Sequence, residues 1–140
     1  MRLFRWKRGK TKASCSFGQY QIYVCDLENL NGDVQTGITV LPGDSVVELP
    51  FVLSASEAHA LAAYLDSLQG GSVPSRHRLR NGLRGLFMNV YFKFRRMDGD
   101  TLKGRISVTS LLGIEYRLAS ASKATLAHCA AALRDSPANA

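Results

Sequence analysis

A run of arginines between residues 76 and 84 is the part of this sequence best suited to binding chemistry. Arg76, Arg78, Arg80 and Arg84 place four guanidinium groups within nine positions. A guanidinium group is a planar fork of donors that can bind a phosphate or the O6/N7 edge of guanine through two hydrogen bonds, and it can also stack on a base. The run therefore predicts a site for a guanine-containing, phosphate-bearing ligand. The alternative is a solvated, charged linker.

The charges are segregated along the chain, which favours a separate task for the second half. Residues 1–12 hold six Lys or Arg and no acid, residues 13–75 hold seven acids and no Lys or Arg, and residues 76–140 hold twelve Lys or Arg and four acids. A chain that needed only solubility would mix the two signs. The anionic and cationic parts either serve a ligand or attract each other, within one chain or across a homodimer.

No group of residues has the spacing of a catalytic or metal centre. Cys15, Cys25 and Cys129 are far apart without a C-x-x-C pair, and the three histidines lack spaced partners. The sequence contains no glycine-rich phosphate loop, G-x-S-x-G elbow or H-E-x-x-H pattern. Its carboxylates are scattered, so no acid/base pair can be named. We therefore expect a non-catalytic binding protein without a cofactor or metal.

Length and composition predict one domain. A chain of 140 residues buries roughly two-thirds of its unfolded surface when it folds. No stretch approaches the ~18 consecutive apolar residues of a membrane span, and the basic start from Met1 to Lys12 is not followed by the apolar stretch of a secretory signal. These features predict a cytoplasmic protein without a membrane span, in which residues 1–12 form a basic segment that is dispensable for folding.

Strand and turn patterns follow the same order in the two halves. Apolar and polar residues alternate in three stretches of each half, and a Gly-Asp turn separates the first two. A glycine follows each turn aspartate four residues later, as Gly37 after Asp33 and as Gly104 after Asp100. The predicted strands cover residues 19–26, 34–41 and 45–53 in the first half, and residues 86–94, 101–109 and 114–118 in the second.

Helical spacing follows the third predicted strand of each half. Ser54 and Glu57 have the spacing of a capping box, and the helix after them is expected to end at Gly70. A second helix is expected from about Ser120. The apolar stripes comprise Ala58, Leu61, Ala62, Leu65 and Leu68 in the first helix, and Leu126, Cys129, Ala130 and Leu133 in the second.

These elements predict an α+β fold built from two strand-strand-strand-helix units. The units cover residues 17–70 and 84–134, and a Gly/Arg-rich linker at residues 71–83 joins them. We expect the two units to form a single barrel-like or twisted-sheet domain.

Two short motifs stand in the second half, Arg76-x-x-x-Arg80 and Ser110-x-x-Gly113. They match R-x-x-x-R and the end of D/N-x-S-x-x-G, the motifs of the PilZ domain, so this half resembles that bacterial β-barrel, which binds cyclic di-GMP. The resemblance covers about residues 76–118 and implies a regulatory domain in which Arg76 and Arg80 hold guanine and phosphate groups. It implies that Ser110 and Gly113 complete the pocket.

Two further residues qualify this PilZ-like site. Arg78 lies between the two motif arginines and is included among the predicted ligand-binding residues. Val108 stands where the family has Asp or Asn, so one ligand group of the family is missing. The strands that a PilZ barrel needs after its second motif would have to come from residues 17–53 in a permuted arrangement.

The order of elements also resembles the PC4, Whirly and PUR group of single-strand nucleic-acid binders. Their repeats typically have four strands before the helix, which here implies extra strands from Met1 to Trp6 and from Arg80 to Arg84. Basic strands with interleaved aromatics suit stacking on bases and contacts to phosphates. A third hypothesis is a subunit that binds a protein partner. The residues that the nucleic-acid alternative places at the interface are Tyr91, Lys93, Arg95, Arg96, Lys103 and Arg105.

Overall fold

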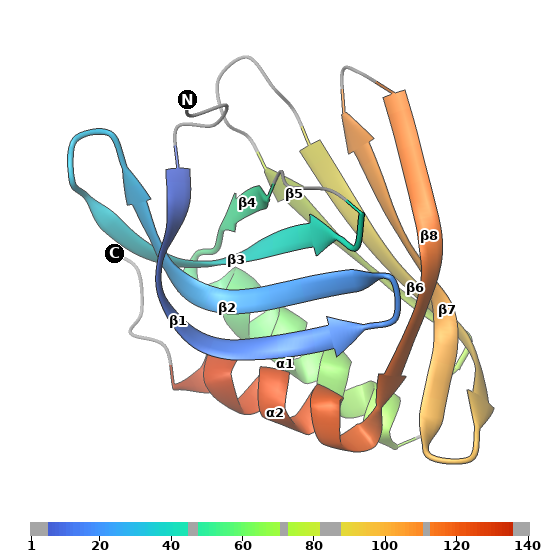
Figure 1. The fold of residues 1–140 in the computed structure, drawn as a ribbon. Helices are drawn as coiled ribbons and strands as arrows, with labels where there is room; N and C mark the ends of the chain where they lie inside the picture. Colours follow the sequence, from blue (N-terminus) through green and yellow to red (C-terminus); the bar gives the residue numbers. More distant parts are fainter. Residues whose placement is uncertain (1–5, 45–47, 71–72, 82–87, 111–112, 136–140) are drawn as a thin grey trace.

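The computed structural model describes residues 6–44, 48–70, 73–81, 88–110 and 113–135 (Figure 1). Within these ranges the order is four strands, a helix, four strands and a helix. The first set is β1 (Trp6–Phe17), β2 (Tyr20–Asn29), β3 (Val34–Pro42), β4 (Leu49–Val52) and α1 (Ala55–Gln69). The second set is β5 (Ser75–Asn81), β6 (Met88–Asp98), β7 (Thr101–Ser110), β8 (Gly113–Ser122) and α2 (Lys123–Arg134).

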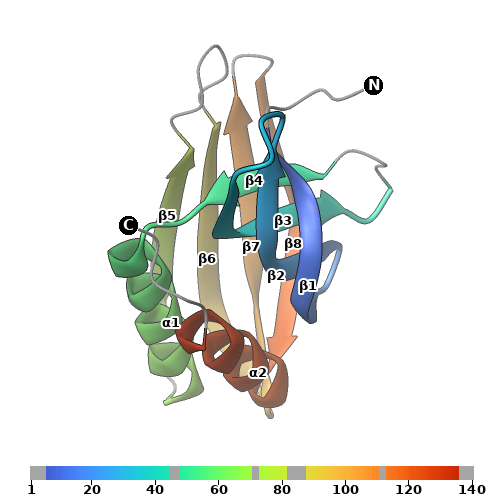
Figure 2. The ribbon, with the colours of Figure 1, turned by 90° about the vertical axis from the view of Figure 1, so that its left-hand side faces the viewer.

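The strands form two antiparallel four-stranded sheets, each in sequence order from β1 to β4 and from β5 to β8. In Figure 1 the strands of the first sheet cross those of the second at a steep angle, and α1 and α2 lie side by side on one side of both sheets (Figures 1 and 2). The α+β class is therefore confirmed. The described strands form two open sheets, so the barrel-like alternative is not what the structure shows.

Side chains from both sheets and both helices form one hydrophobic core. The end of β1 reaches the second sheet, because the Phe17 ring lies 6.2 Å from Phe92 and 6.5 Å from Phe94 between ring centroids. The apolar stripes expected on the helices are buried, including Leu65 on α1 and Leu126 on α2. The first half therefore shares its core with the second half, which supplies part of the contacts of its buried side chains.

The helix boundaries follow from their caps. The Ser54 side chain accepts a hydrogen bond from the Glu57 backbone N–H, and the Glu57 side chain accepts one from Ser54, so the predicted capping box is confirmed. The second helix begins at Lys123 after the cap residue Ser122, later than the predicted start near Ser120. The reason is that β8 continues to Ser122, with Ser120 paired to Lys103 on β7.

The prediction of three strands in each unit is wrong in the first half because β1 precedes the predicted strands. It pairs with β2 from Trp6 to Phe17, and its second part buries Ala13, Cys15 and Phe17. Its first part is basic and exposed, which hides the alternation that marks a strand. Removing residues 1–12 would delete the pairing around Trp6, so we no longer expect this segment to be dispensable. Residues 1–5 lie outside the described ranges.

The second half also has four strands, because part of the predicted linker forms β5. Residues Ser75–Asn81 pair antiparallel with β6. Charged side chains alternate here with Leu79, which is buried, and with half-buried His77, whose ring stacks on Tyr64 at 4.9 Å between centroids. A strand with one buried face needs only these few inward contacts. The fourth strand expected from Arg80 to Arg84 ends at Asn81, and residues 82–87 lie outside the described ranges.

Candidate functional site

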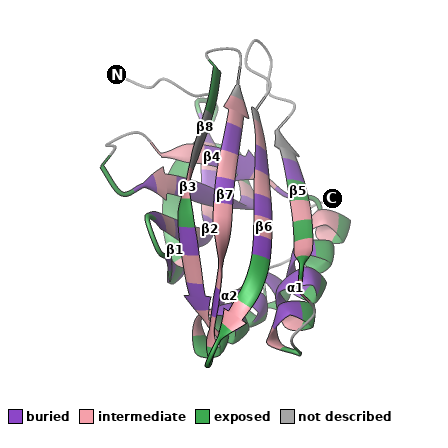
Figure 3. Cartoon of the chain, turned by 90° about the vertical axis from the view of Figure 1, so that its right-hand side faces the viewer, coloured by how far each residue is buried: buried purple, intermediate pink, exposed green. Residues whose placement is uncertain are grey.

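The two faces of the β5–β8 sheet differ in character. One face is part of the core and carries Val90, Phe92 and Phe94 on β6, together with Leu102 and Ile106 on β7. Because side chains alternate along a strand, the residues between them point away from the core. Figure 3 turns this sheet toward the reader and shows buried positions alternating with exposed or half-buried ones. The outward positions on β5–β7 are Arg76, Arg78, Tyr91, Lys93, Lys103, Arg105 and Ser107.

Three cations lie in one row across this outward face. Arg76 pairs with Lys93, Lys93 pairs with Arg105, and Arg105 pairs with Leu118 on β8. Neighbouring strands are about 4.8 Å apart, and like charges directly opposite one another destabilise a sheet. Arg76 and Lys93 therefore repel each other across the two strands, and an anion bound between them would remove this cost.

A second row places an aromatic ring beside this charge. Arg78 on β5 pairs with Tyr91 on β6, and Tyr91 pairs with Ser107 on β7. Tyr91 is half-buried on the outward face. The face therefore offers a ring for stacking two residue pairs along the sheet from the row of Arg76, Lys93 and Arg105.

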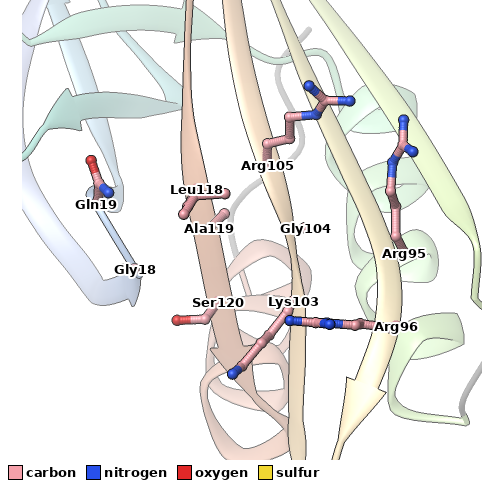
Figure 4. A pocket seen from close by; sticks show the side chains of 10 residues that line it. All are labelled: Gly18, Gln19, Arg95, Arg96, Lys103, Gly104, Arg105, Leu118, Ala119 and Ser120. Atoms are coloured by element: carbon pink, nitrogen blue, oxygen red, sulfur yellow. The ribbon is translucent and has the colours of Figure 1, made fainter.

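A β-bulge on β6 brings two more arginines to the surface. The register shifts between Phe94 and Arg96, so Arg95 has no cross-strand partner and both arginines are exposed. Opposite the bulge stands Gly104, where a Cβ would overlap the Lys93 carbonyl oxygen. Bulges of this kind turn side chains to new directions. In Figure 4 the Arg96 side chain extends from β6 toward Lys103 on β7.

A pocket of ≈ 690 Å³ lies between these cations and the turn that joins β1 to β2. The turn is seated on β8, because the Gln19 backbone N–H donates to the Leu118 carbonyl at 3.3 Å. Gly18 has a φ of 69°, and a Cβ there would lie 2.8 Å from the Ser120 nitrogen, so the turn requires glycine. The lining residues, shown in Figure 4, are Gly18, Gln19, Arg95, Arg96, Lys103, Gly104, Arg105, Leu118, Ala119 and Ser120.

Some basic residues of the second half have acidic partners. Arg117 on β8 contacts Asp44 at 2.7 Å, and Arg134 on α2 pairs with Asp66 on α1. These contacts support the prediction that the anionic and cationic parts attract each other within one chain. Lys103 contacts Asp98 at 3.0 Å, and this hydrogen-bonded ion pair lowers the pKa of Asp98.

Other cations of the outward face have no such partner. Within the described part of the chain, no acidic side chain lies within 4.0 Å of Arg76, Arg78, Lys93 or Arg95. The attraction between the two parts of the chain therefore does not account for this group. Its charge is available to a ligand.

The residues suggested by the PilZ resemblance are spread along the second sheet. Arg76 and Arg78 are exposed, whereas Val108 is only 7% exposed and faces the core. Ser110 pairs with Gly113 at the end of the β7–β8 hairpin, five positions along β7 from Arg105 in the Arg76 row. The described side chains do not bring Arg76 and Gly113 into one pocket, because register separates them.

Arg80 lies closer to that end of the sheet. Its Cα pairs with Asn89, and Asn89 pairs with Thr109, the residue before Ser110. The side chains of Arg80 and Ser110 lie outside the described part of the structure.

The residues of the nucleic-acid alternative are brought together more completely. Tyr91 and Lys93 lie on the outward face, and four other residues of this set line the pocket: Arg95, Arg96, Lys103 and Arg105. Sequence reasoning missed the other wall of the pocket, where Gly18, Gln19, Leu118 and Ser120 meet across about one hundred positions. The exposed glycine turn at Gly18 was the only local signal for it.

No three His, Cys, Asp or Glu side chains of the described part are grouped so that they could hold a metal ion. None of its helices has the length and apolar character needed to cross a membrane.

Comparisons with known proteins find no counterpart for this chain. No family model matches it, and no curated protein or solved structure is significantly similar to it.

Proposed function

We propose that this chain binds single-stranded nucleic acid on the outward face of the β5–β8 sheet, as a binding protein and not as an enzyme. The observation that carries the proposal is the in-register row of Arg76, Lys93 and Arg105, which lies next to the pair of Arg78 and Tyr91. Cations positioned in this way can contact successive phosphates, and the Tyr91 ring can stack on a base.

An open sheet face suits a single strand better than a duplex. A single strand can lay its bases flat on side chains of a sheet, whereas the bases of a duplex are already stacked on one another. Leu118, which is 69% exposed on β8, adds an apolar side chain at the end of the row. The face thus combines charge for the backbone with ring and apolar surface for the bases.

The acidic residues of the first half repel a bound strand less strongly than their number in the sequence suggests. Asp26 contacts Lys12 at 3.3 Å, Glu48 is hydrogen-bonded to Arg8, and Asp44 and Asp66 contact basic residues of the second half. These pairs neutralise part of the negative charge that would repel a phosphate backbone. Repulsion between the first half and a bound strand is reduced accordingly.

Cyclic di-GMP binding is the competing proposal, and one observation favours it. The register places Arg80 at the same end of the sheet as Ser110 and Gly113. Buried Val108 gives no polar group to such a site. Two cations of the row, Lys93 on β6 and Arg105 on β7, have no role in this proposal, which is why we favour the nucleic acid.

The test compares two double variants that remove the same charge from different sheets. Arg76→Ala with Lys93→Ala removes two cations of the outward row, whereas Lys7→Ala with Lys10→Ala removes two exposed cations of β1. Binding of a fluorescent oligothymidylate is measured by anisotropy at several salt concentrations. The first variant should bind more weakly and lose about 0.7 of the salt slope for each lost phosphate contact. The second should change little.

Cyclic di-GMP is titrated by calorimetry in parallel. Saturable binding of the dinucleotide without an oligonucleotide signal would replace our proposal with the competing one. Equal losses in the two double variants would show that net charge alone, and not the β5–β8 face, attracts the strand.

A further inference from the structure

The pocket beside the β1–β2 turn differs from the rest of the outward face. The rows on β5–β7 are open, but the pocket has a wall, because Gly18 and Gln19 of the first half stand against β8. The wall is held from both sides. The Gln19 N–H donates to the Leu118 carbonyl, and the Gln19 carbonyl accepts from the Gly43 N–H at 2.7 Å. A strand that crosses the sheet from β5 toward β8 would meet this wall.

The pocket also holds more positive charge than one phosphodiester needs. Arg95, Arg96, Lys103 and Arg105 all line it. A phosphodiester carries one negative charge, whereas a terminal phosphomonoester carries about −1.5 to −2 at neutral pH and exposes three acceptor oxygens. Asp98 is one acidic group near the pocket, and its ion pair with Lys103 would compete with a bound phosphate. Arg95 and Arg96 add two more positive charges, which the single carboxylate of Asp98 does not neutralise.

Size and lining suit one nucleotide. A volume of ≈ 690 Å³ lies within the range of about 300–1,000 Å³ for small-ligand pockets. Leu118 gives an apolar contact for a sugar or a base, and Gln19 has an amide that can donate to or accept from polar atoms. Cations of β6 and β7 beside the apolar Leu118 side chain fit a nucleoside with a phosphate on one end.

We infer that this pocket binds a terminal phosphomonoester nucleotide, so that the protein prefers strands with a phosphorylated end. The inference rests on the proposed function, since the strand reaches the pocket along the row of Arg76, Lys93 and Arg105. The wall formed by Gly18 and Gln19 stops the strand, and Arg96 and Lys103 take the dianion. A free nucleoside monophosphate has the same chemistry and would occupy the same pocket.

The experiment compares three oligonucleotides of one sequence with an internal fluorophore: one with a 5′-phosphate, one with a 3′-phosphate and one with hydroxyl groups at both ends. One phosphorylated form should bind roughly tenfold more tightly than the hydroxyl form. Arg96→Gln with Lys103→Gln should abolish this ratio. Arg76→Ala with Lys93→Ala should weaken all three oligonucleotides and keep the ratio, which makes it the matched control.

Equal affinities of the three oligonucleotides for the native chain would overturn the preference for phosphorylated ends while leaving the proposed function intact. Equilibrium dialysis with a nucleoside monophosphate and with the parent nucleoside forms a second arm that needs no strand binding. Selective binding of the monophosphate, lost in Arg96→Gln with Lys103→Gln, would support the pocket even if no oligonucleotide bound. Absence of both the end preference and the monophosphate binding would sink the inference. Circular dichroism melting of each variant verifies that it is folded.

Discussion

The two sheets share an architecture but treat their charges differently. Each has four antiparallel strands in sequence order and leads into a helix. On the first sheet, Arg8 is hydrogen-bonded to Glu48 and lies 4.0 Å above the Tyr23 ring centroid. On the second, Arg76 and Lys93 stand opposite each other in the register. Arg8 of the first sheet thus has an acidic partner, whereas no acidic side chain of the described residues lies within 4.0 Å of Arg76 or Lys93.

Whether an exposed cation on a sheet can bind a ligand depends on the groups that already surround it. The pKa of Arg8 is raised, first by its hydrogen bond to Glu48, so the first sheet holds this cation in a fixed geometry. A guanidinium group held in that way contributes little to a new ligand, because binding would first break the existing pair. Counting arginines along the sequence could not separate the two cases.

The largest expected effect tests whether the two sheets depend on one core. Leu65 on α1 and Leu126 on α2 are 1% and 0% exposed. Replacing either by Ala should lower the free energy of unfolding by about 2–5 kcal/mol, since truncation leaves a cavity. Urea unfolding should show one transition in both variants, because both helices contribute to a common core. Two transitions, with only one shifted in each variant, would mean that the sheets unfold independently.

Much of the fold follows from the sequence where one strand face is buried. Residues of β2 and β6 alternate between apolar and polar types, which predicts two strands. The capping box at Ser54 predicts the start of α1. The first part of β1 carries neighbouring charged residues, and β5 has Leu79 as its one apolar residue among three arginines. A periodicity argument cannot find such strands, because their pairing partners and not their own pattern make them strands.

The candidate site was predictable in its cations but not in its shape. Tyr91, Lys93 and Arg105 were identified because charge and aromatic residues alternate on predicted strands. The Arg95 bulge was not, since a register shift depends on the opposite strand. The wall at Gly18 depends on a contact with Ser120, which no local pattern encodes. Contacts between distant parts of the chain could not be predicted from local sequence patterns.

An intermediate effect compares equivalent glycines in the two sheets. A Cβ at Gly104 would overlap the Lys93 carbonyl oxygen, and one at Gly37 would overlap the Phe51 carbonyl oxygen. Replacing either glycine by Ala should cost about 1–3 kcal/mol of stability through forced backbone shifts. Gly70→Ala is the control, because its nearest neighbour would lie at 3.5 Å and its φ is −80°.

The two glycine variants should differ in binding. Gly104→Ala disturbs the strand opposite the Arg95 bulge, so it should weaken oligonucleotide binding in addition to stability. Gly37→Ala lies in the first sheet and should affect stability alone. Thermal melts together with anisotropy at a temperature where both variants are folded measure the two effects. Equal losses of oligonucleotide binding in Gly104→Ala and Gly37→Ala would show that the two sheets do not differ in binding.

The smallest expected effect concerns His77, which lies at the edge of the second sheet. Its ring stacks on Tyr64, and burial lowers its pKa below the ordinary value of 6.5. The unfolded chain therefore takes up a proton at a higher pH than the folded one does. The contribution of His77 to stability is complete above the unfolded pKa and decreases as the pH falls below it toward the folded pKa. His77→Phe should keep the stacking and remove this dependence.

Urea unfolding between about pH 8 and about pH 5 measures this effect. The native chain should lose stability over the lower part of this range, and His77→Phe should lose less. His128→Gln, at an exposed position on α2, is the control and should follow the native chain. Because His77 is only partly buried, the difference should be smaller than that of any core or glycine variant. A native profile that rises toward acid pH would contradict the sign, and would mean that the stack on Tyr64 favours the protonated ring.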